Sequence, residues 1–236
     1  MNEQKNFYTP DRVKNLYGEI IPAYQVAFAD DTWYEVSKCV DENKKQRCVS
    51  GLSTLAIGSL CDTCRLCPSR PAYETNELVE RFNAVASSRP TAWYVEQNGE
   101  GLTMAAVAWR ATSSVIAEEK YCNVAEISDW LNRILGNNEI MWLDEVFANK
   151  ALKQRGNLQN FGSFVKGLAN KLDVNTVAYR TISPQMVGAA RRDFGDNAQI
   201  FAGQRDRTKV SNIDIAGTVP DRRDFMLINI GLESER

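Results

Sequence analysis

The stretch Ile140 to Phe147, IMWLDEVF, opens the part of the sequence that decides the fold. Its apolar run, interrupted near the end by two acids, is typical of a strand covered on both faces. A polar, basic segment from Ala148 to Asn160 follows, and Asn175 to Arg180 predicts a second strand. Between them, apolar residues recur with the spacing of one buried helix face, at Phe161, Phe164, Val165, Leu168 and Leu172. The sequence therefore predicts a strand, a loop, a helix and a second strand.

Gly162 falls in the first turn of the predicted helix. Backbone N–H groups in a first turn have no partner within the helix, and they carry a partial positive charge. A glycine there lets a phosphate approach without meeting a side chain. Two interpretations fit these residues: a phosphate-binding loop, and an ordinary crossover whose glycine only turns the chain.

The six residues Gln159 to Phe164, QNFGSF, resemble the Q/R-x-x-G-x-G/A signature of the GNAT acyltransferase superfamily, with Phe164 where Gly or Ala is usual. In that family the signature joins a strand to a helix, and its amides hold the pyrophosphate of acetyl-CoA. The resemblance implies an acyltransferase that uses acetyl-CoA. It also implies a cofactor-binding set of Phe147, Arg155, Gly156, Gln159, Asn160, Phe161, Gly162, Ser163, Phe164 and Ser183.

Other predicted elements follow the order of a GNAT domain. Thr9 and Pro10 predict a helix start, with Pro22 as its end or a kink, and Ser128 and Ser183 predict two further helix starts. The remaining predictions are a helix over Thr75 to Ala86 and strands over Ala92 to Gln97, Leu102 to Ala111, Gln199 to Phe201 and Asp224 to Gly231. We therefore expect one α/β (α+β) domain over residues 1–236, with a mixed, mostly antiparallel central sheet flanked by helices.

Five of the six cysteines cluster as C-x8-C-x12-C-x2-C-x2-C, at Cys39, Cys48, Cys61, Cys64 and Cys67. Paired C-x2-C thiolates can take adjacent corners of a zinc tetrahedron, and two further cysteines complete a closed structural site. Cys39, Cys48, Cys61 and Cys64 are the first assignment, with Cys67 as the substitute ligand. Residues 37–72 are thus predicted to form a metal-stapled loop insertion that binds structural Zn²⁺.

Two alternatives to zinc stay open for this cluster. An iron-sulfur cluster also uses cysteine thiolates, and the spacing from Cys61 to Cys67 faintly resembles that of a ferredoxin. Disulfides are the second alternative, disfavoured because the N-terminus lacks the apolar core of a secretion signal. In GNAT proteins this region of the chain helps to form the acceptor pocket.

Composition excludes several classes of protein. The 236 residues are 44% hydrophobic and 25% charged, which suits a globular domain with a sizeable core. The net charge of -2 gives no basic field for nucleic acid. No apolar run reaches the length of a membrane span, so we expect a cytoplasmic protein without a membrane partner. Nothing in the sequence constrains the oligomeric state.

The chain contains no histidine. This removes the commonest general base near neutral pH and the commonest nitrogen ligand of metals. Ser-His-Asp and Cys-His chemistry within the chain is therefore excluded. Proton transfer has to use carboxylates, Tyr, Lys, Cys or water.

By resemblance, Glu145 is the expected general base, because GNAT enzymes often place a glutamate on this strand. Strand alternation predicts that Asp144 points to the opposite face. The family's usual acid, a tyrosine in the helix after the second strand, is missing from Gln185 to Phe194, which leaves Tyr179 or a water to protonate the thiolate. A backbone N–H near Phe147 is the expected oxyanion donor.

Two functions from different classes remain open at the level of sequence. One is an N-acetyltransferase that transfers acetyl from acetyl-CoA to an amine on a small molecule or a peptide. The other is a catalytically silent, zinc-organised interaction protein of the same fold.

Overall fold

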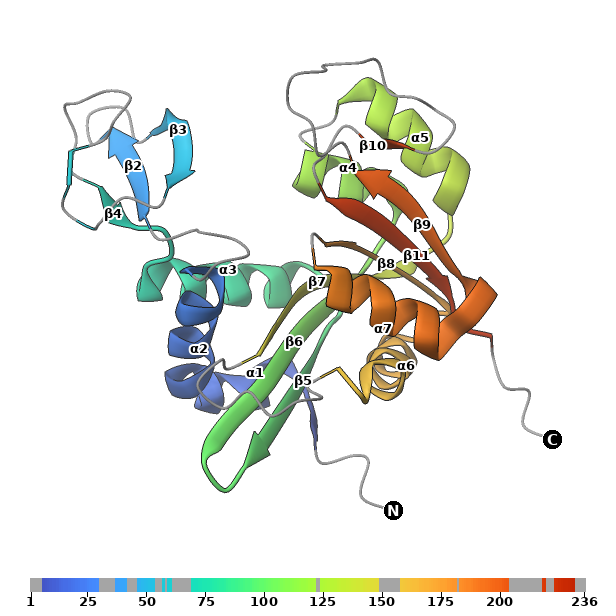
Figure 1. Cartoon of the computed structure of the whole chain (residues 1–236), viewed down its shortest axis with the longest axis horizontal. Helices are drawn as coiled ribbons and strands as arrows, with labels where there is room; N and C mark the ends of the chain where they lie inside the picture. The colour runs from blue at the N-terminus through green and yellow to red at the C-terminus, as the bar shows by residue number, and fades with distance from the viewer. Residues whose placement is uncertain are drawn as a thin grey trace.

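The predicted strand at Ile140 lies in the middle of an eight-stranded sheet. The computed structural model describes residues 6–29, 37–41, 46–53, 57, 59–60, 69–121, 124–148, 158–181, 183–203, 218–219 and 223–231. In spatial order the central sheet comprises β1 (Phe7–Tyr8), β5 (Thr91–Asn98), β6 (Gly101–Ala111), β7 (Ile140–Ala148), β8 (Thr176–Thr181), β11 (Asp224–Asn229), β9 (Ala198–Gly203) and β10 (Thr218–Val219), as Figure 1 shows. Among the described strands of this sheet, the parallel pairs are β7–β8 and β9–β10. The predicted mixed, mostly antiparallel sheet is confirmed.

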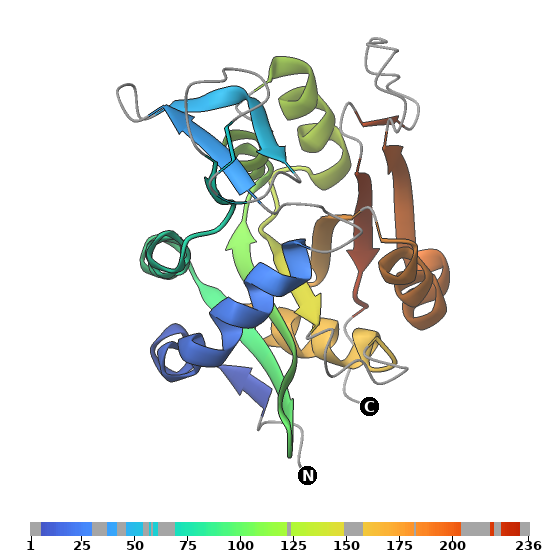
Figure 2. The ribbon, with the colours of Figure 1, turned by 60° about the vertical axis from the view of Figure 1, so that its left-hand side comes forward.

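Helices cover both faces of this sheet (Figures 1 and 2). They are α1 (Pro10–Val13), α2 (Tyr17–Ala29), α3 (Thr75–Ser88), α4 (Ser113–Tyr121), α5 (Ala125–Leu135), α6 (Phe161–Leu172) and α7 (Pro184–Phe194), with 3-10 turns at Lys14–Leu16 and Gly195–Asn197. One buried cluster packs α6 and α7 on one face, and two others pack α1 to α3 and α4 to α5 on the opposite face. Alternate residues of the central strands enter opposite clusters, as a pleated sheet requires.

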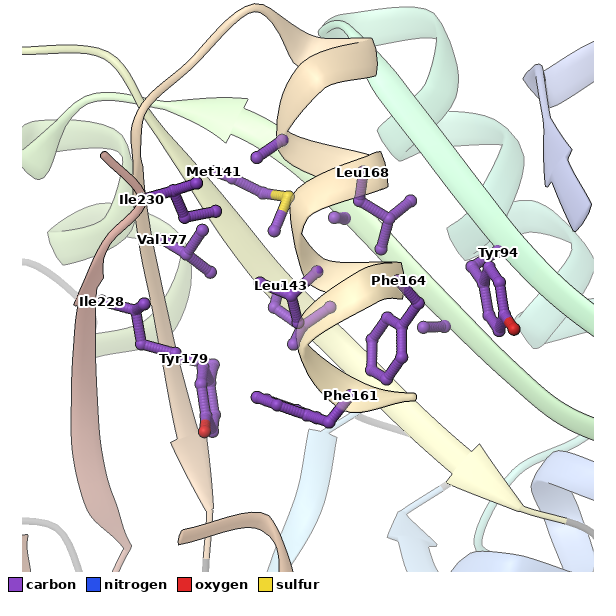
Figure 3. Packing of buried hydrophobic residues seen from close by; sticks show 14 of the residues in the cluster. Tyr94, Met141, Leu143, Phe161, Phe164, Leu168, Val177, Tyr179, Ile228 and Ile230 are labelled. Atoms are coloured by element: carbon purple, nitrogen blue, oxygen red, sulfur yellow. The ribbon is translucent and has the colours of Figure 1, made fainter. Parts of the chain in front are cut away.

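The predicted strand, helix and strand at the centre of the chain are confirmed as β7, α6 and β8. All five apolar residues predicted for α6 are buried, and Figure 3 shows Phe161, Phe164 and Leu168 on the side of α6 that faces the sheet. Ser183 begins α7 as expected, because its hydroxyl accepts a hydrogen bond from the backbone N–H of Met186 at 3.4 Å. The β5–β6 hairpin also has the predicted bounds to within a residue.

Two predicted helix boundaries are wrong. Pro22 lies inside α2 and does not end it, since the helix continues to Ala29. The alternative expectation, a kink at Pro22, stays a prediction. The buried residues Ile20, Ile21, Tyr24 and Phe28 hold the helix in the core, and this packing outweighs one lost hydrogen bond. Ser128 does not begin α5, which starts at Ala125 after Val124. Its hydroxyl instead donates to the Val124 carbonyl at 3.1 Å.

The cysteine-rich segment contains strands where the sequence predicted a loop. β2 (Ser37–Asp41), β3 (Gln46–Ser53) and β4 (Arg70–Pro71) form a separate antiparallel sheet in the order β3-β2-β4. This small sheet lies outside the central one (Figure 1). The expected loop is therefore wrong for these three ranges.

Candidate functional site

β7 and β8 part after a short stretch of pairing. Their described parallel pairing joins Met141 to Val177 and Trp142 to Ala178 and goes no further, although both strands continue. Beyond Trp142, the backbone of β7 pairs with β6 but not with β8. Because the strands are parallel, their parted carboxyl ends lie at the same edge of the sheet. Ligands commonly bind beyond such carboxyl ends.

A β-bulge at Asp144 lies at the start of this unpaired stretch. Val107 of β6 pairs with Glu145, and Ala108 pairs with Leu143, so Asp144 is the extra residue. A bulge shifts the alternation of side chains by one position. Asp144 and Glu145 consequently face the same side of the sheet, and the predicted opposite orientation of Asp144 is wrong.

The guanidinium of Arg81, on α3, contacts both acids. Its Nη2 lies 2.6 Å from Oε1 of Glu145 and 3.4 Å from Oδ2 of Asp144. Its Nη1 donates to the hydroxyl of Tyr24 on α2 at 3.2 Å, and that hydroxyl donates to Oε1 of Glu145 at 3.1 Å. Burial opposes the charge of Arg81, but Glu145, Tyr24 and Asp144 raise its pKa overall. Arg81 is therefore charged at every working pH.

Asp144 is the more buried of the two acids, with 6% of its side chain exposed. Its Oδ1 is ion-paired with Lys120 of α4 and accepts from the indole N–H of Trp142 at 3.1 Å. Burial alone would raise the pKa of this carboxyl, but Lys120 and Arg81 hold it below its ordinary value. Asp144 is thus ionised, and both of its carboxylate oxygens are held by ion pairs or hydrogen bonds.

Glu145 differs from Asp144 in its surroundings. Its side chain is 15% exposed, and the two hydrogen bonds described above both end on Oε1. Among the residues that the structure describes, none donates a hydrogen bond to Oε2. These described neighbours therefore anchor the carboxylate through one oxygen only.

The first turn of α6 already holds an anion. The backbone N–H of Gly162 donates to Oδ2 of Asp193, on α7, at 2.8 Å. A Cβ added at Gly162 would lie 2.9 Å from Cβ of Asp193, so this glycine also permits the close approach of α7. Hydrogen bonds from Arg192 and from Gly162 hold the pKa of Asp193 below its ordinary value, against partial burial. This glycine thus has two roles in the structure, because its N–H binds a carboxylate of the chain and its lack of a side chain admits α7. Its use as a phosphate-binding loop stays a prediction.

The other predicted cofactor residues are dispersed. Gln159, Asn160 and Ser163 are exposed at the start of α6, whereas Phe147, Phe161 and Phe164 are buried in the core. Ser183 begins α7. Arg155 and Gly156 lie outside the described residues.

The two predicted catalytic residues face opposite sides of the sheet. Tyr179, on β8, packs against α6 with 1% of its surface exposed, and its ring lies 6.1 Å from that of Phe161 (Figure 3). Its hydroxyl donates to the Met186 carbonyl at 3.4 Å, and burial raises its pKa. Glu145 instead faces α2 and α3. The structure does not bring the two side chains together.

The predicted metal ligands fall partly outside the described chain. Cys61, Cys64 and Cys67 lie outside the described residues, and so do the side chains of Cys39 and Cys48. The backbone of β2 and β3 pairs Val40 with Arg47, so Cys39 and Cys48 each lie one residue from that pair. Within the described part of the chain, no group of three or more metal-ligating side chains is found.

Arg81 and Lys120 were missed at the level of sequence, although each interrupts an apolar helix face. Arg81 stands three residues after Leu78 and one before Phe82, both buried. Lys120 likewise stands four residues after the buried Ile116. A cation at such a position predicts a buried acidic partner, because unpaired charges are rarely buried.

Comparison with known proteins gives matches in structure only. No protein-family model matches the chain, and no curated protein sequence matches it. A structure from Corynebacterium glutamicum described as histone acetyltransferase HPA2 and related acetyltransferase is similar at 11% identity, with 94% of each chain covered and a TM-score of 0.46. A mosquito arylalkylamine N-acetyltransferase like 5b is similar at 10% identity, with 66% of this chain and 82% of that chain covered and a TM-score of 0.41.

A third similar structure is the polyamine N-acetyltransferase of Drosophila melanogaster, at 14% identity, with 62% of this chain and 78% of that chain covered and a TM-score of 0.39.

In the part of the chain that the structure describes, no helix is both long enough and apolar enough to cross a membrane.

Proposed function

We propose that the chain is a GNAT-type N-acetyltransferase that transfers acetyl from acetyl-CoA to an amine by direct attack. The observation that carries this proposal is the parting of β7 and β8 beside a bulge that presents Glu145. Together with the QNFGSF signature at the start of α6, it supports a donor site next to an ionisable group. The acceptor is an amine on a small molecule or a peptide.

Acetyl-CoA would bind along the open edge of β7. The pantetheine arm of CoA carries amide groups, and a strand edge without a partner binds extended amides by main-chain hydrogen bonds. The pyrophosphate would lie at the first turn of α6, where Gly162 now donates to a carboxylate. Arg155, Gly156, Gln159, Asn160 and Ser163 would complete this end of the site, and Ser183 would lie at the start of α7.

Each chemical step has an assigned group of the protein, except the last, for which a water is the alternative. The amine nitrogen attacks the acetyl carbonyl carbon, a C–N bond forms, and Glu145 takes the proton that the nitrogen loses. A backbone N–H near Phe147 stabilises the oxyanion, which then collapses with cleavage of the C–S bond. Tyr179 or a water returns a proton to the thiolate. Burial favours the neutral phenol of Tyr179, the form that can donate.

Thermal unfolding with acetyl-CoA, followed by assay of free CoA in the presence of amines, tests this proposal. A ligand that binds only the folded state raises the melting temperature. We expect a rise with acetyl-CoA and release of CoA with at least one amine among polyamines, arylalkylamines and peptides. No rise at millimolar acetyl-CoA contradicts the proposal.

A second candidate function is a silent binding protein of the same fold. Two observations favour it: Asp193 occupies the N–H of Gly162, and α7 contains no tyrosine to act as an acid. This candidate predicts that acetyl-CoA is not turned over with any amine in the same panel. The two candidates are therefore separated by CoA release rather than by binding.

We further propose that residues 37–72 form an insertion that binds a structural zinc ion through Cys39, Cys48, Cys61 and Cys64, or with Cys67 in place of one of them. Pairing of β2 with β3 brings Cys39 and Cys48 to nearby backbone positions, which supports their sharing one ion. Metal analysis of protein purified without oxygen tests this. We expect about one zinc per chain, whereas iron with visible absorbance would contradict the assignment.

A further inference from the structure

The two acids at the bulge are held in different ways. Asp144 has donors on both oxygens, from Lys120, Trp142 and Arg81. Among the residues that the structure describes, Glu145 has donors on Oε1 alone, from Arg81 and Tyr24. Of these two adjacent carboxylates on one face of the sheet, Glu145 is thus the one with an oxygen, Oε2, that accepts no hydrogen bond from the described residues.

We infer that Arg81 and Tyr24 are positioning residues that fix Oε1 of Glu145 so that Oε2 is the oxygen that accepts the proton of the acceptor amine. This inference rests on the proposed function, in which Glu145 is the general base. In this inference, Asp144 and Lys120 help to hold Arg81 in place and take no part in proton transfer.

Arg81, Tyr24 and Glu145 form a closed ring of three hydrogen bonds, which we call the clamp. Arg81 donates to Tyr24 at 3.2 Å and to Glu145 at 2.6 Å, and Tyr24 donates to Glu145 at 3.1 Å. Rotation of the Glu145 carboxylate would break two of the three bonds at once. Tyr24 is itself fixed by the rings of Phe28, Phe82 and Phe147, whose centroids lie 4.4 to 5.9 Å away. Such preorganisation lowers the barrier to proton transfer by removing misaligned conformers.

The charges around Glu145 are balanced. It is faced by Tyr24 from α2, Arg81 from α3 and Asp144 on its own strand, with Lys120 of α4 behind Asp144. Two cations and two carboxylates give this group no net charge. Burial, reinforced by Glu145, raises the pKa of Tyr24 well above its ordinary value, so this hydroxyl keeps its proton. The clamp therefore stays closed across the pH range of an assay.

The variants Arg81→Gln, Arg81→Lys and Tyr24→Phe test the clamp, with Arg12→Gln, an exposed residue of α1, as the control. Each is assayed for kcat and for KM of acetyl-CoA. For Arg81→Gln we expect kcat to fall about tenfold, with KM changed less than about twofold, because positioning and not donor binding is lost. Arg81→Lys should recover part of the loss, and Tyr24→Phe should lower kcat about threefold.

Folding of each variant is checked by circular dichroism and thermal unfolding. If Arg81→Gln does not fold, Arg81→Lys and Tyr24→Phe decide the question, since both keep the bulk of the side chain. An active wild type whose Arg81→Lys and Tyr24→Phe variants keep its kcat overturns the inference alone. A wild type that releases no CoA overturns the proposed function, and this inference with it.

Discussion

Arg81 on α3 and Glu145 on β7 are joined by an ion pair of 2.6 Å, although 64 residues separate them in the chain. The bulge at Asp144 makes this pair possible, because it turns both acids of β7 toward the same helix. Arg81, with 34% of its side chain exposed, lies at the rim of the cluster and not at its centre. The ion pair thus connects helix packing to the group proposed as the base.

Gly162→Ala should destabilise the protein, because the added Cβ would lie 2.9 Å from Cβ of Asp193. Overpacking of this kind costs about 1–3 kcal/mol. The free energy of unfolding in urea measures the effect. Gly188→Ala on α7 is the matched control, since a Cβ there meets nothing within 4 Å. The control should stabilise by about 0.4–1 kcal/mol, and equal effects of the two variants would contradict the packing contact.

Asp193→Ala should tighten binding of acetyl-CoA while lowering stability. The variant frees the N–H of Gly162 and removes a negative charge from the proposed pyrophosphate site. A unit charge about 4 Å away is worth about 1 kcal/mol in water, which corresponds to about fivefold in affinity. Isothermal titration calorimetry measures the dissociation constant, with Asp196→Ala, an exposed acid just after α7, as the control. Unchanged or weaker binding would show that Gly162 serves packing alone.

Asp144→Asn should cost about 3–5 kcal/mol of stability at pH 7, because Lys120 is left buried without its partner. The pKa of Asp144 is lower in the folded state than its ordinary value, so its stabilisation is present above about pH 4 and is lost as pH falls through the folded-state value. The difference in unfolding free energy between wild type and variant should therefore shrink from pH 5 to pH 2.

Asp11→Asn is the control for this pH dependence. Asp11 pairs with Lys14 at 3.2 Å on the exposed surface of the first helical turns. Exposed pairs contribute about 0–1 kcal/mol, so the control should change little at any pH. A difference for Asp144→Asn that stays constant down to pH 2 would contradict the ionised, paired state of Asp144.

The strand, helix and strand at the centre of the chain could be predicted because their apolar periodicity is long and uninterrupted. Ile140 to Leu143 form a continuous apolar run, and α6 repeats its buried residues over three turns. Strand alternation failed at Asp144, since a bulge is set by the partner strand and leaves no local sequence mark. The orientation of the two acids therefore needed the structure.

The hydrogen-bond partners of Glu145 could not be predicted from the sequence either. Arg81 and Tyr24 come from helices 64 and 121 residues away, and only the tertiary packing of α2 and α3 on the sheet brings them to β7. Periodicity does mark Arg81 as a charge on an apolar face, but it cannot name the partner. The contact of Asp193 with Gly162 has no such mark, because Asp193 resembles any polar residue near a helix end.

The central claim is that Glu145 is the base of an acetyl transfer, and Glu145→Gln tests it most directly. The measurement is the initial rate of CoA release from acetyl-CoA with the best amine of the panel, for wild type and variant side by side. General bases contribute about 10²–10⁴-fold, so we predict a loss of that size, with acetyl-CoA still raising the melting temperature of the variant. A variant that releases CoA at the wild-type rate, or a wild type that releases none, would contradict the account.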